Sequence, residues 1–278
     1  MAALNWSPVQ AHRDVDWTRP WLQPVAELGQ AVLLDWETRG GALVESLNRV
    51  LDAPVTFVDQ QALGPQMPYE THVAKLGQVP TRENLHDFFN ALTWATWPQA
   101  KSQLNRVHAH ALAVSPSEPK HRGPVRDGLT LLDENGAVLV APVRLWRALR
   151  AHDWQTAFLK ARDDWQSANL WLIGHALMQQ LTQPRKGLTA HVWLMDEDLN
   201  AWACEQMRLG QTNEKIRTQV DQEWAKCIHA EAMTPKPFTP LPVLGVPGWW
   251  AQNADPVFYD DEQVFRPKRA QTRAKPTP

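Results

Sequence analysis

The residues best suited to chemistry lie in one stretch of the chain, residues 80–98, which reads PTRENLHDFFNALTWATWP. In it, His86 can exchange a proton near neutral pH, Asp87 offers a carboxylate and Asn90 offers an amide. His86 and Asn90 are four residues apart, so on a helix their side chains can converge on one point. This set could supply a general acid or base, the group that orients it, and an amide that positions a substrate.

A helix over residues 84–97 must position these groups. Prolines bracket the stretch, Thr81 and Asn84 are favoured N-cap residues, and a first-turn carboxylate at Asp87 suits the helix dipole. At about 100° per residue, the apolar side chains share one face and the polar ones share the opposite face. The polar face contains no Lys, Arg or Glu, and Trp94 and Trp97 lie among its polar groups. It is therefore either the wall of a pocket or a second buried interface whose polar groups are satisfied by their neighbours.

Four further residues could complete a site if the fold brings them near: His108, His175, Arg126 and Asp127. His108 is predicted at the edge of a helix over residues 99–113. Because His110 is rotated by about 200° from it, the two rings cannot bind one ion. His175 is predicted inside a buried helix that opens at residues 163–164 and runs to about residue 182, beside Gly174, which allows another backbone to approach closely. Each histidine also has a plain structural interpretation as a satisfied core residue.

The pair Arg126 and Asp127 is expected where a loop enters a strand, a place where catalytic groups often lie, although a structural ion pair is the alternative. Two apolar runs flank Asp133-Glu134-Asn135-Gly136, and Asn-Gly between such runs predicts a hairpin over residues 128–141. Asp133 and Glu134 are therefore interpreted as turn residues. If a divalent metal binds, the predicted ligands are His86, Asp87 and His108, although their spacing matches no standard template.

The predicted fold is α+β, a mainly helical single domain over residues 1–265. Its small antiparallel or mixed sheet combines the hairpin with a strand over residues 188–195. Nine of the 22 prolines lie in residues 235–278, so residues 234–265 are predicted to form an extended Pro/Trp-rich strap packed on the domain. Basic residues without acidic ones follow, which predicts a disordered basic tail over residues 266–278.

Composition narrows the function classes. The 278 residues carry a net charge of −2, so there is no basic excess to neutralise nucleic-acid phosphates. The most apolar segment is too short to span a bilayer, and no secretory signal is recognisable. The chain has two cysteines, Cys204 and Cys227, and free thiols at both positions fit a reducing compartment. We therefore expect a cytoplasmic protein with no nucleic-acid or membrane partner. Fifteen Trp against two Tyr predict a core and pocket built from indoles.

Four segments carry a family resemblance: NLHDFFNALTWATWPQAKSQLN at residues 84–105, RDGLTLLDENG at 126–136, GHAL at 174–177, and PVLGVPGWW with FYDDEQVFRP within 242–267. In these the chain resembles a bacterial family catalogued as domain of unknown function 3025, over most of residues 66–267. The resemblance implies a bacterial protein and brings no catalytic residues with it. The site candidates therefore come from the residues themselves.

Two functions from different classes follow. The first is an enzyme, a metal-assisted hydrolase, in which a polar site on the helix over residues 84–97 acts on a small molecule. The second is a non-catalytic interaction or scaffold protein that binds another protein and in which the polar helix serves packing only. The P-loop, the dinucleotide glycine fingerprint, the Gly-x-Ser-x-Gly elbow, paired CxxC and His-Glu-x-x-His are all absent from the sequence. A pocket at the polar helix face favours the enzyme, and a sealed face favours the scaffold.

Overall fold

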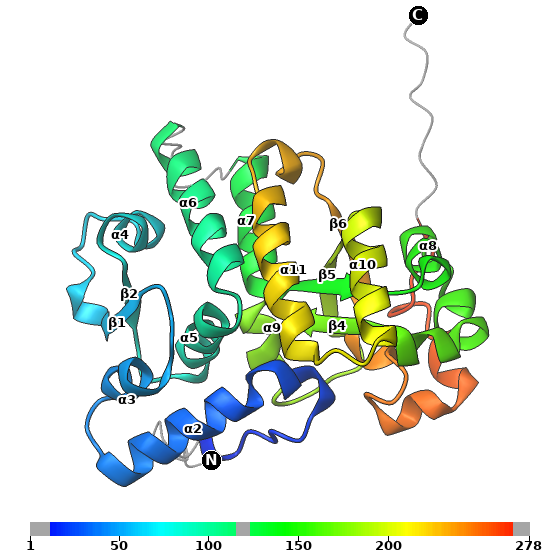
Figure 1. Cartoon of the computed structure of the whole chain (residues 1–278), viewed down its shortest axis with the longest axis horizontal. Coiled ribbons are helices and arrows are strands. Elements are labelled where there is room, and N and C mark those ends of the chain that lie inside the picture. Colours follow the sequence, from blue (N-terminus) through cyan, green and yellow to red (C-terminus); the bar gives the residue numbers. More distant parts are fainter. Residues whose placement is uncertain (1–11, 115–122, 269–278) are drawn as a thin grey trace, which may run out of the picture.

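A computed structural model describes residues 12–114 and 123–268 (Figure 1). Within these residues the main sheet has four strands in the order β4 (Asn169–Leu172), β3 (Gly136–Val140), β5 (Thr189–Leu194) and β6 (Phe238–Pro242). β3 runs parallel to β5 and antiparallel to β4, and β6 runs antiparallel to β5. Helices account for most of the remaining regular structure, so the predicted α+β, mainly helical fold with a small mixed sheet is confirmed.

The two faces of this sheet are buried in different hydrophobic clusters, because successive side chains of a strand point to opposite faces. Val138, Trp171 and Trp193 lie in a cluster with residues of α10 (Glu197–Arg208) and α11 (Asn213–Cys227), the helices that lie in front of the sheet in Figure 1. Leu139 and Val192 lie in the other cluster, with residues of α8 (Val143–Ala151) and of the N-terminal helices. The sheet thus forms the middle layer.

A smaller parallel sheet pairs β1 (Thr56–Asp59) with β2 (Gln78–Thr81). It lies beside α3 (Leu43–Val50) and α4 (Tyr69–Leu76), and α2 (Gln23–Arg39) runs along the edge of the molecule beneath it (Figure 1). Between this unit and the main sheet lie α5 (Leu85–Thr96) and α6 (Pro98–Val114). The predicted central helix is therefore present as α5, and the Asn84 side chain accepts a hydrogen bond from the Asp87 backbone at its N-terminus.

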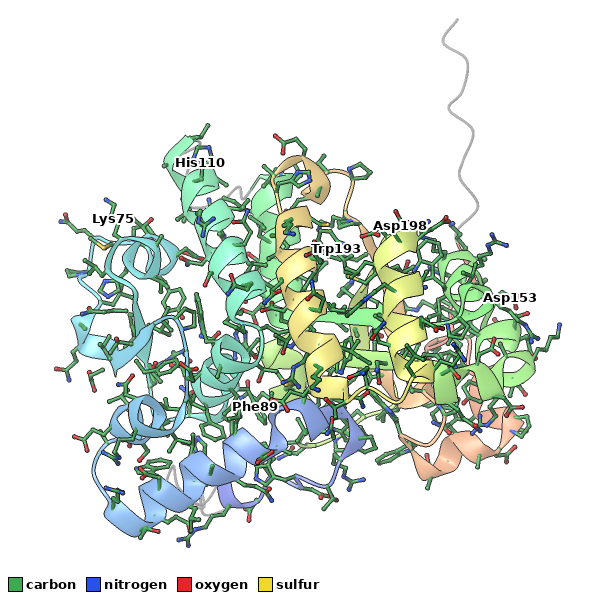
Figure 2. All side chains as sticks on the ribbon, viewed as in Figure 1. Lys75, Phe89, His110, Asp153, Trp193 and Asp198 are labelled. Atoms are coloured by element: carbon green, nitrogen blue, oxygen red, sulfur yellow. The ribbon has the colours of Figure 1, made fainter. Side chains whose placement is uncertain are left out.

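The helix expected over residues 99–113 is also present, as α6. His108 is buried on it, whereas His110 is exposed at its outer end (Figure 2). The two rings therefore do not face one site, as their spacing predicts. Figure 2 also labels Phe89, which is fully buried on the apolar face of α5.

The hairpin predicted over residues 128–141 is wrong. A helix, α7 (Pro124–Asn135), occupies its first half, and only the second half is a strand, β3. Leu129 and Leu132, three residues apart, are both completely buried on one face of α7, which is the spacing of a helix rather than of a strand. A short apolar run fits either structure, and here the tertiary packing selects the helix.

The buried helix predicted from residues 163–164 to about residue 182 is wrong as well. Its apolar middle forms β4, and α9 (His175–Gln180) begins after it. A segment in which nearly every residue is apolar suits a buried strand as well as a buried helix. Here it is a strand, and its side chains are buried on both faces because both faces of the main sheet are covered. Gly174 ends the strand segment and serves as the N-cap residue of α9, which places His175 at a helix start rather than inside a helix.

The C-terminal strap packs on the domain as expected, with Phe258, Tyr259 and Phe265 buried and Trp249 and Trp250 partly buried against the larger cluster. It is more regular than the prolines indicate, because residues 238–242 form the edge strand β6, where missing N–H groups are tolerated.

Most of the predicted basic tail, residues 269–278, lies outside the described residues. Cys204 and Cys227 are free thiols, as predicted. No helix in the described part of the chain is long and apolar enough to cross a membrane.

Candidate metal centre

The polar face of α5 borders a pocket of about 330 Å³. His86, Asp87, Asn90 and Trp94 of α5 line it together with side chains from four other helices. Those helices contribute Tyr69 and Glu70 from α4, Lys101 and His108 from α6, Asp133 and Glu134 from α7, and His175 from α9. The face is therefore part of a pocket wall rather than a sealed packing surface.

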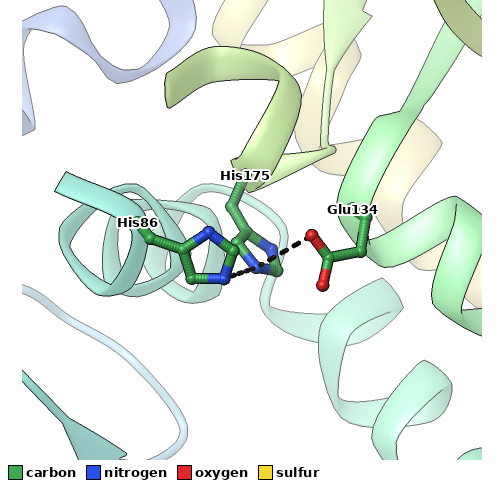
Figure 3. Close-up of side chains that lie close together, drawn as sticks. All are labelled: His86, Glu134 and His175. Carbon is green, nitrogen blue, oxygen red and sulfur yellow. Dashed lines mark hydrogen bonds and ion pairs between the residues drawn. The ribbon is translucent and has the colours of Figure 1, made fainter. Parts of the chain in front are cut away.

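Three side chains meet in this pocket: His86, His175 and Glu134 (Figure 3). The Nε2 atoms of the two histidines lie 3.1 Å apart, and the Glu134 Oε2 atom lies 4.0 Å from His175 Nε2. One nitrogen or oxygen atom from each of the three residues lies within 4.8 Å of the other two. Two nitrogens bound to one tetrahedral zinc ion are about 3.3 Å apart, so the histidine pair already has the separation of a metal site.

The opposite nitrogens of the two rings differ in their contacts. His86 Nδ1 lies 3.2 Å from Gln179 Oε1, within hydrogen-bond distance, whereas His175 Nδ1 lies 3.8 Å from Asp133 Oδ2 and has no hydrogen-bond partner among the described residues. A proton on His86 Nδ1, opposite the Gln179 oxygen, leaves His86 Nε2 with a lone pair. The 3.1 Å contact is a hydrogen bond in which one Nε2–H donates to the other Nε2, and a metal ion in place of that proton would have both Nε2 atoms as ligands.

His175 is held as the neutral ring that a metal requires. Burial lowers the pKa of His175 to about 4, although the Asp133 carboxylate acts in the opposite direction. A second imidazole in direct contact adds to the cost of a proton on this ring. At neutral pH the His175 imidazole is therefore uncharged, with a nitrogen lone pair available to a ligand.

Gly174 makes the close approach of His175 to Glu134 possible. A Cβ atom at this position would lie 2.6 Å from the backbone of Asn135 and 2.6 Å from the carbonyl oxygen of Glu134. The Gly174 N–H donates to the carbonyl of Gly136, which joins the start of α9 to the end of α7. The close backbone approach predicted beside Gly174 is therefore confirmed, and its partner is the segment that carries Glu134.

Asp133 is held in place by a buried lysine. The Lys101 side chain is only 3% exposed, and its Nζ atom lies 2.5 Å from Asp133 Oδ1 and 2.8 Å from Asn90 Oδ1. Burial alone raises the pKa of the Asp133 carboxyl, but Lys101 and the histidines outweigh it and hold this pKa below its usual value. Asp133 is therefore ionised and presents its other oxygen to His175.

Asp87 is engaged with Arg82 rather than with the histidines. Its two oxygens accept hydrogen bonds from the Arg82 guanidinium and from the Arg82 backbone N–H, at 2.7 to 2.9 Å. Such a two-point contact fixes the loop that precedes α5. Of the three predicted metal ligands, only His86 belongs to the three-residue cluster. His108 lines the pocket and lies 3.6 Å from Glu70, outside that cluster.

The structure brings His86, Asp87, Asn90, His108 and His175 to one pocket, and leaves Arg126 and Asp127 out of its lining. Those two residues lie in the first turn of α7, not at the entry of a strand as predicted. The interpretation of Asp133 and Glu134 as turn residues is wrong, because they lie in the last turn of α7 and line the pocket. The helical spacing of Leu129 and Leu132 was the sequence signal that could have identified them.

A family model described as protein of unknown function (DUF3025) matches residues 55–269, so the chain belongs to this family. The matched residues include every side chain of the pocket described above. Comparison with curated proteins and with solved structures finds no match.

Proposed function

We propose that this member of the family is a hydrolase that depends on one divalent metal ion, held by His86, His175 and Glu134. The observation that carries the proposal is the pair of Nε2 atoms facing each other at 3.1 Å beside a carboxylate, in a pocket. Two histidines and one glutamate form one of the ligand sets of catalytic zinc, in which water or substrate takes the fourth position.

The surroundings of the three ligands support this assignment. Metal-bound histidines almost always donate their other N–H to a carboxylate or a carbonyl oxygen. Gln179 lies within hydrogen-bond distance of His86 Nδ1, and the Asp133 carboxylate, 3.8 Å from His175 Nδ1, would serve His175 after a small approach. Glu134 is partly exposed, with 36% of its side chain accessible, so a small rotation can close the 4.0 Å distance to His175 Nε2. A bound ion of this kind lowers the pKa of its water and so generates a nucleophile near neutral pH.

The pocket also bears on the choice between enzyme and scaffold. Its volume of about 330 Å³ is within the range of small-molecule sites, and ionisable groups converge in it. A face that only served packing has no need of such a space, so the pocket favours the enzyme.

We further propose a cytoplasmic location, supported by the two free thiols Cys204 and Cys227.

Elemental analysis of tag-free protein purified without chelators tests the metal. We expect close to one equivalent of zinc or a related ion in the wild type and His110→Gln, and almost none in His86→Gln. His110 is the matched control because it is an exposed histidine on the neighbouring helix. Hydrolysis of 4-nitrophenyl acetate should be lost on metal removal and restored by zinc. Equal metal content in the three proteins would contradict the assignment.

A further inference from the structure

A directed chain of hydrogen bonds runs from Lys101 to Tyr69 in this pocket. Lys101 Nζ lies 2.8 Å from Asn90 Oδ1, and Asn90 Nδ2 lies 3.0 Å from the Tyr69 hydroxyl oxygen. An ammonium group can only donate, so the Asn90 oxygen must face Lys101 and the Asn90 NH₂ group must face Tyr69. The Tyr69 oxygen is therefore the acceptor in this contact, and its own proton points elsewhere.

The Tyr69 proton is available to a ligand. Among the described residues, the contact with Asn90 is the one hydrogen bond recorded for the Tyr69 hydroxyl, and Tyr69 lines the pocket. Burial, helped by the Asp133 carboxylate, raises the pKa of Tyr69 above its usual value, so the phenol keeps its proton. Asn90 was expected to position substrate, and its contacts with Lys101 and Tyr69 give it a further role, the orientation of the Tyr69 hydroxyl.

A second neutral donor lines the same pocket. The Trp94 side chain is 3% exposed, and its indole N–H has no hydrogen-bond partner within the described residues. A buried N–H without a partner is costly, but this nitrogen is itself buried, so a ligand oxygen would reach it only after a shift of the pocket wall. Tyr69 is therefore the uncharged donor that a ligand meets directly.

The charges of the pocket disfavour a phosphate ligand. Four carboxylates line it: Glu70, Asp87, Asp133 and Glu134. The two cationic side chains of its lining, Arg82 and Lys101, are already paired with Asp87 and Asp133. With a divalent ion bound, the four carboxylates balance Arg82, Lys101 and the ion, so a dianionic group would meet no net positive charge. An uncharged carbonyl needs only neutral donors and one metal ion.

We propose that Tyr69 is a substrate-contacting residue, oriented by Lys101 and Asn90, that donates its hydroxyl proton in a hydrogen bond to the carbonyl oxygen of a carboxylic ester or amide. This inference rests on the metal-dependent hydrolase proposed above. Hydrolysis adds water across the C–O or C–N bond and yields a carboxylic acid with an alcohol or an amine. The Tyr69 hydroxyl would stabilise the negative charge that develops on the carbonyl oxygen as water attacks, and a bound metal ion would supply positive charge beside it.

The test uses zinc-loaded full-length protein and acetohydroxamate, a small carbonyl compound that chelates zinc, titrated by calorimetry. We expect Tyr69→Phe to bind acetohydroxamate about tenfold more weakly than the wild type, the usual effect of one lost hydrogen bond. Zinc content after the titration, equal in the two proteins, shows that the variant is folded and loaded. Inorganic phosphate should bind the wild type more weakly than acetohydroxamate does.

The possible failures are distinguishable. Equal acetohydroxamate affinity in zinc-loaded wild type and Tyr69→Phe would overturn the role of Tyr69 and leave the metal site intact. Tighter binding of phosphate than of acetohydroxamate would overturn the ester or amide class. A wild type that binds no zinc would overturn the proposed hydrolase, and the inference with it.

Discussion

His86 Nε2 and His175 Nε2 lie 3.1 Å apart although their residues are 89 positions apart in the chain. His86 comes from the first turn of α5, and His175 is the first residue of α9. Their rings meet edge to face, with centroids 4.5 Å apart. One ring donates an Nε2–H to the other in this contact, and under the proposed function a metal ion would take the place of that proton.

Replacement of Glu134 by Gln should weaken zinc binding by more than about 100-fold, since even outer-sphere partners contribute 10- to 100-fold. The amide keeps the shape of the side chain and loses the charge that the ion requires. Competition with a fluorescent zinc chelator measures the affinity. Asp127→Asn is the control, because Asp127 is an exposed carboxylate on the same helix. A similar effect in both variants would rule out a specific role for Glu134.

Lys101→Met should lower the free energy of unfolding by about 3–5 kcal/mol at pH 7, because it leaves the Asp133 carboxylate without its buried partner. Urea denaturation measures the loss. The double variant Lys101→Met with Asp133→Asn should recover part of it, since the unpaired charge is then gone. If Lys101→Met alone is as stable as the wild type, the ion pair between Lys101 and Asp133 contributes nothing to stability.

The effect of Lys101 on stability should also depend on pH. Lys101 and the histidines hold the pKa of Asp133 below its ordinary value of 3.8 in the folded protein, despite the opposing effect of burial. A lowered acid pKa means that the stabilisation is complete above pH 4 and is lost as the pH falls through the folded-state value. The difference between wild type and Lys101→Met in urea denaturation should therefore shrink below pH 4. A difference that grows on acidification would contradict this assignment.

Gly174→Ala should disrupt the site although Gly174 does not line the pocket. The added Cβ atom would overlap the backbone of residues 134–135, so α9 must move away from the end of α7. We expect a loss of about 1–3 kcal/mol in the free energy of unfolding and a weaker zinc affinity. Gly187→Ala is the matched control, because nothing lies within 4 Å of its added Cβ. Unchanged zinc affinity in Gly174→Ala would show that the close approach is not needed.

Asp221 of α11 stabilises the start of α6. Its carboxylate accepts hydrogen bonds from the backbone N–H groups of Gln99 and Ala100, both at 2.9 Å. Asp221→Ala leaves these buried donors without partners and should cost about 1–3 kcal/mol in the free energy of unfolding. Thermal denaturation measures this loss of stability, and Glu214→Ala on the same helix is the control. Equal stability of the two variants would contradict this role.

The sequence predicted the part of the site that depends on local periodicity. Asn84 caps α5 and the polar face of α5 carries His86, because helix capping and a 3.6-residue period are local properties. For Glu134 two local sequence signals conflict. Its place in α7 depends on the burial of Leu129 and Leu132 against other elements, and the local Asn-Gly signal points to a hairpin instead.

Lys101 and Tyr69 show a second limit of sequence analysis. A lysine at the edge of a helix is expected in solvent, but Asp133, 32 residues away, and Asn90 pair with Lys101 in its buried position. Tyr69 follows a Pro-rich loop typical of the surface, and its contact with Asn90 spans 21 residues. Both roles arise from long-range contacts, which residue types and spacing do not encode.

The most direct test is a crystal of the wild-type protein grown with zinc, with diffraction data collected on both sides of the zinc absorption edge. The account predicts one anomalous peak in the pocket, about 2.0–2.2 Å from His86 Nε2, His175 Nε2 and a Glu134 carboxylate oxygen. A pocket without a peak, or a peak bound by Asp87 and His108 instead of Glu134 and His175, would contradict it.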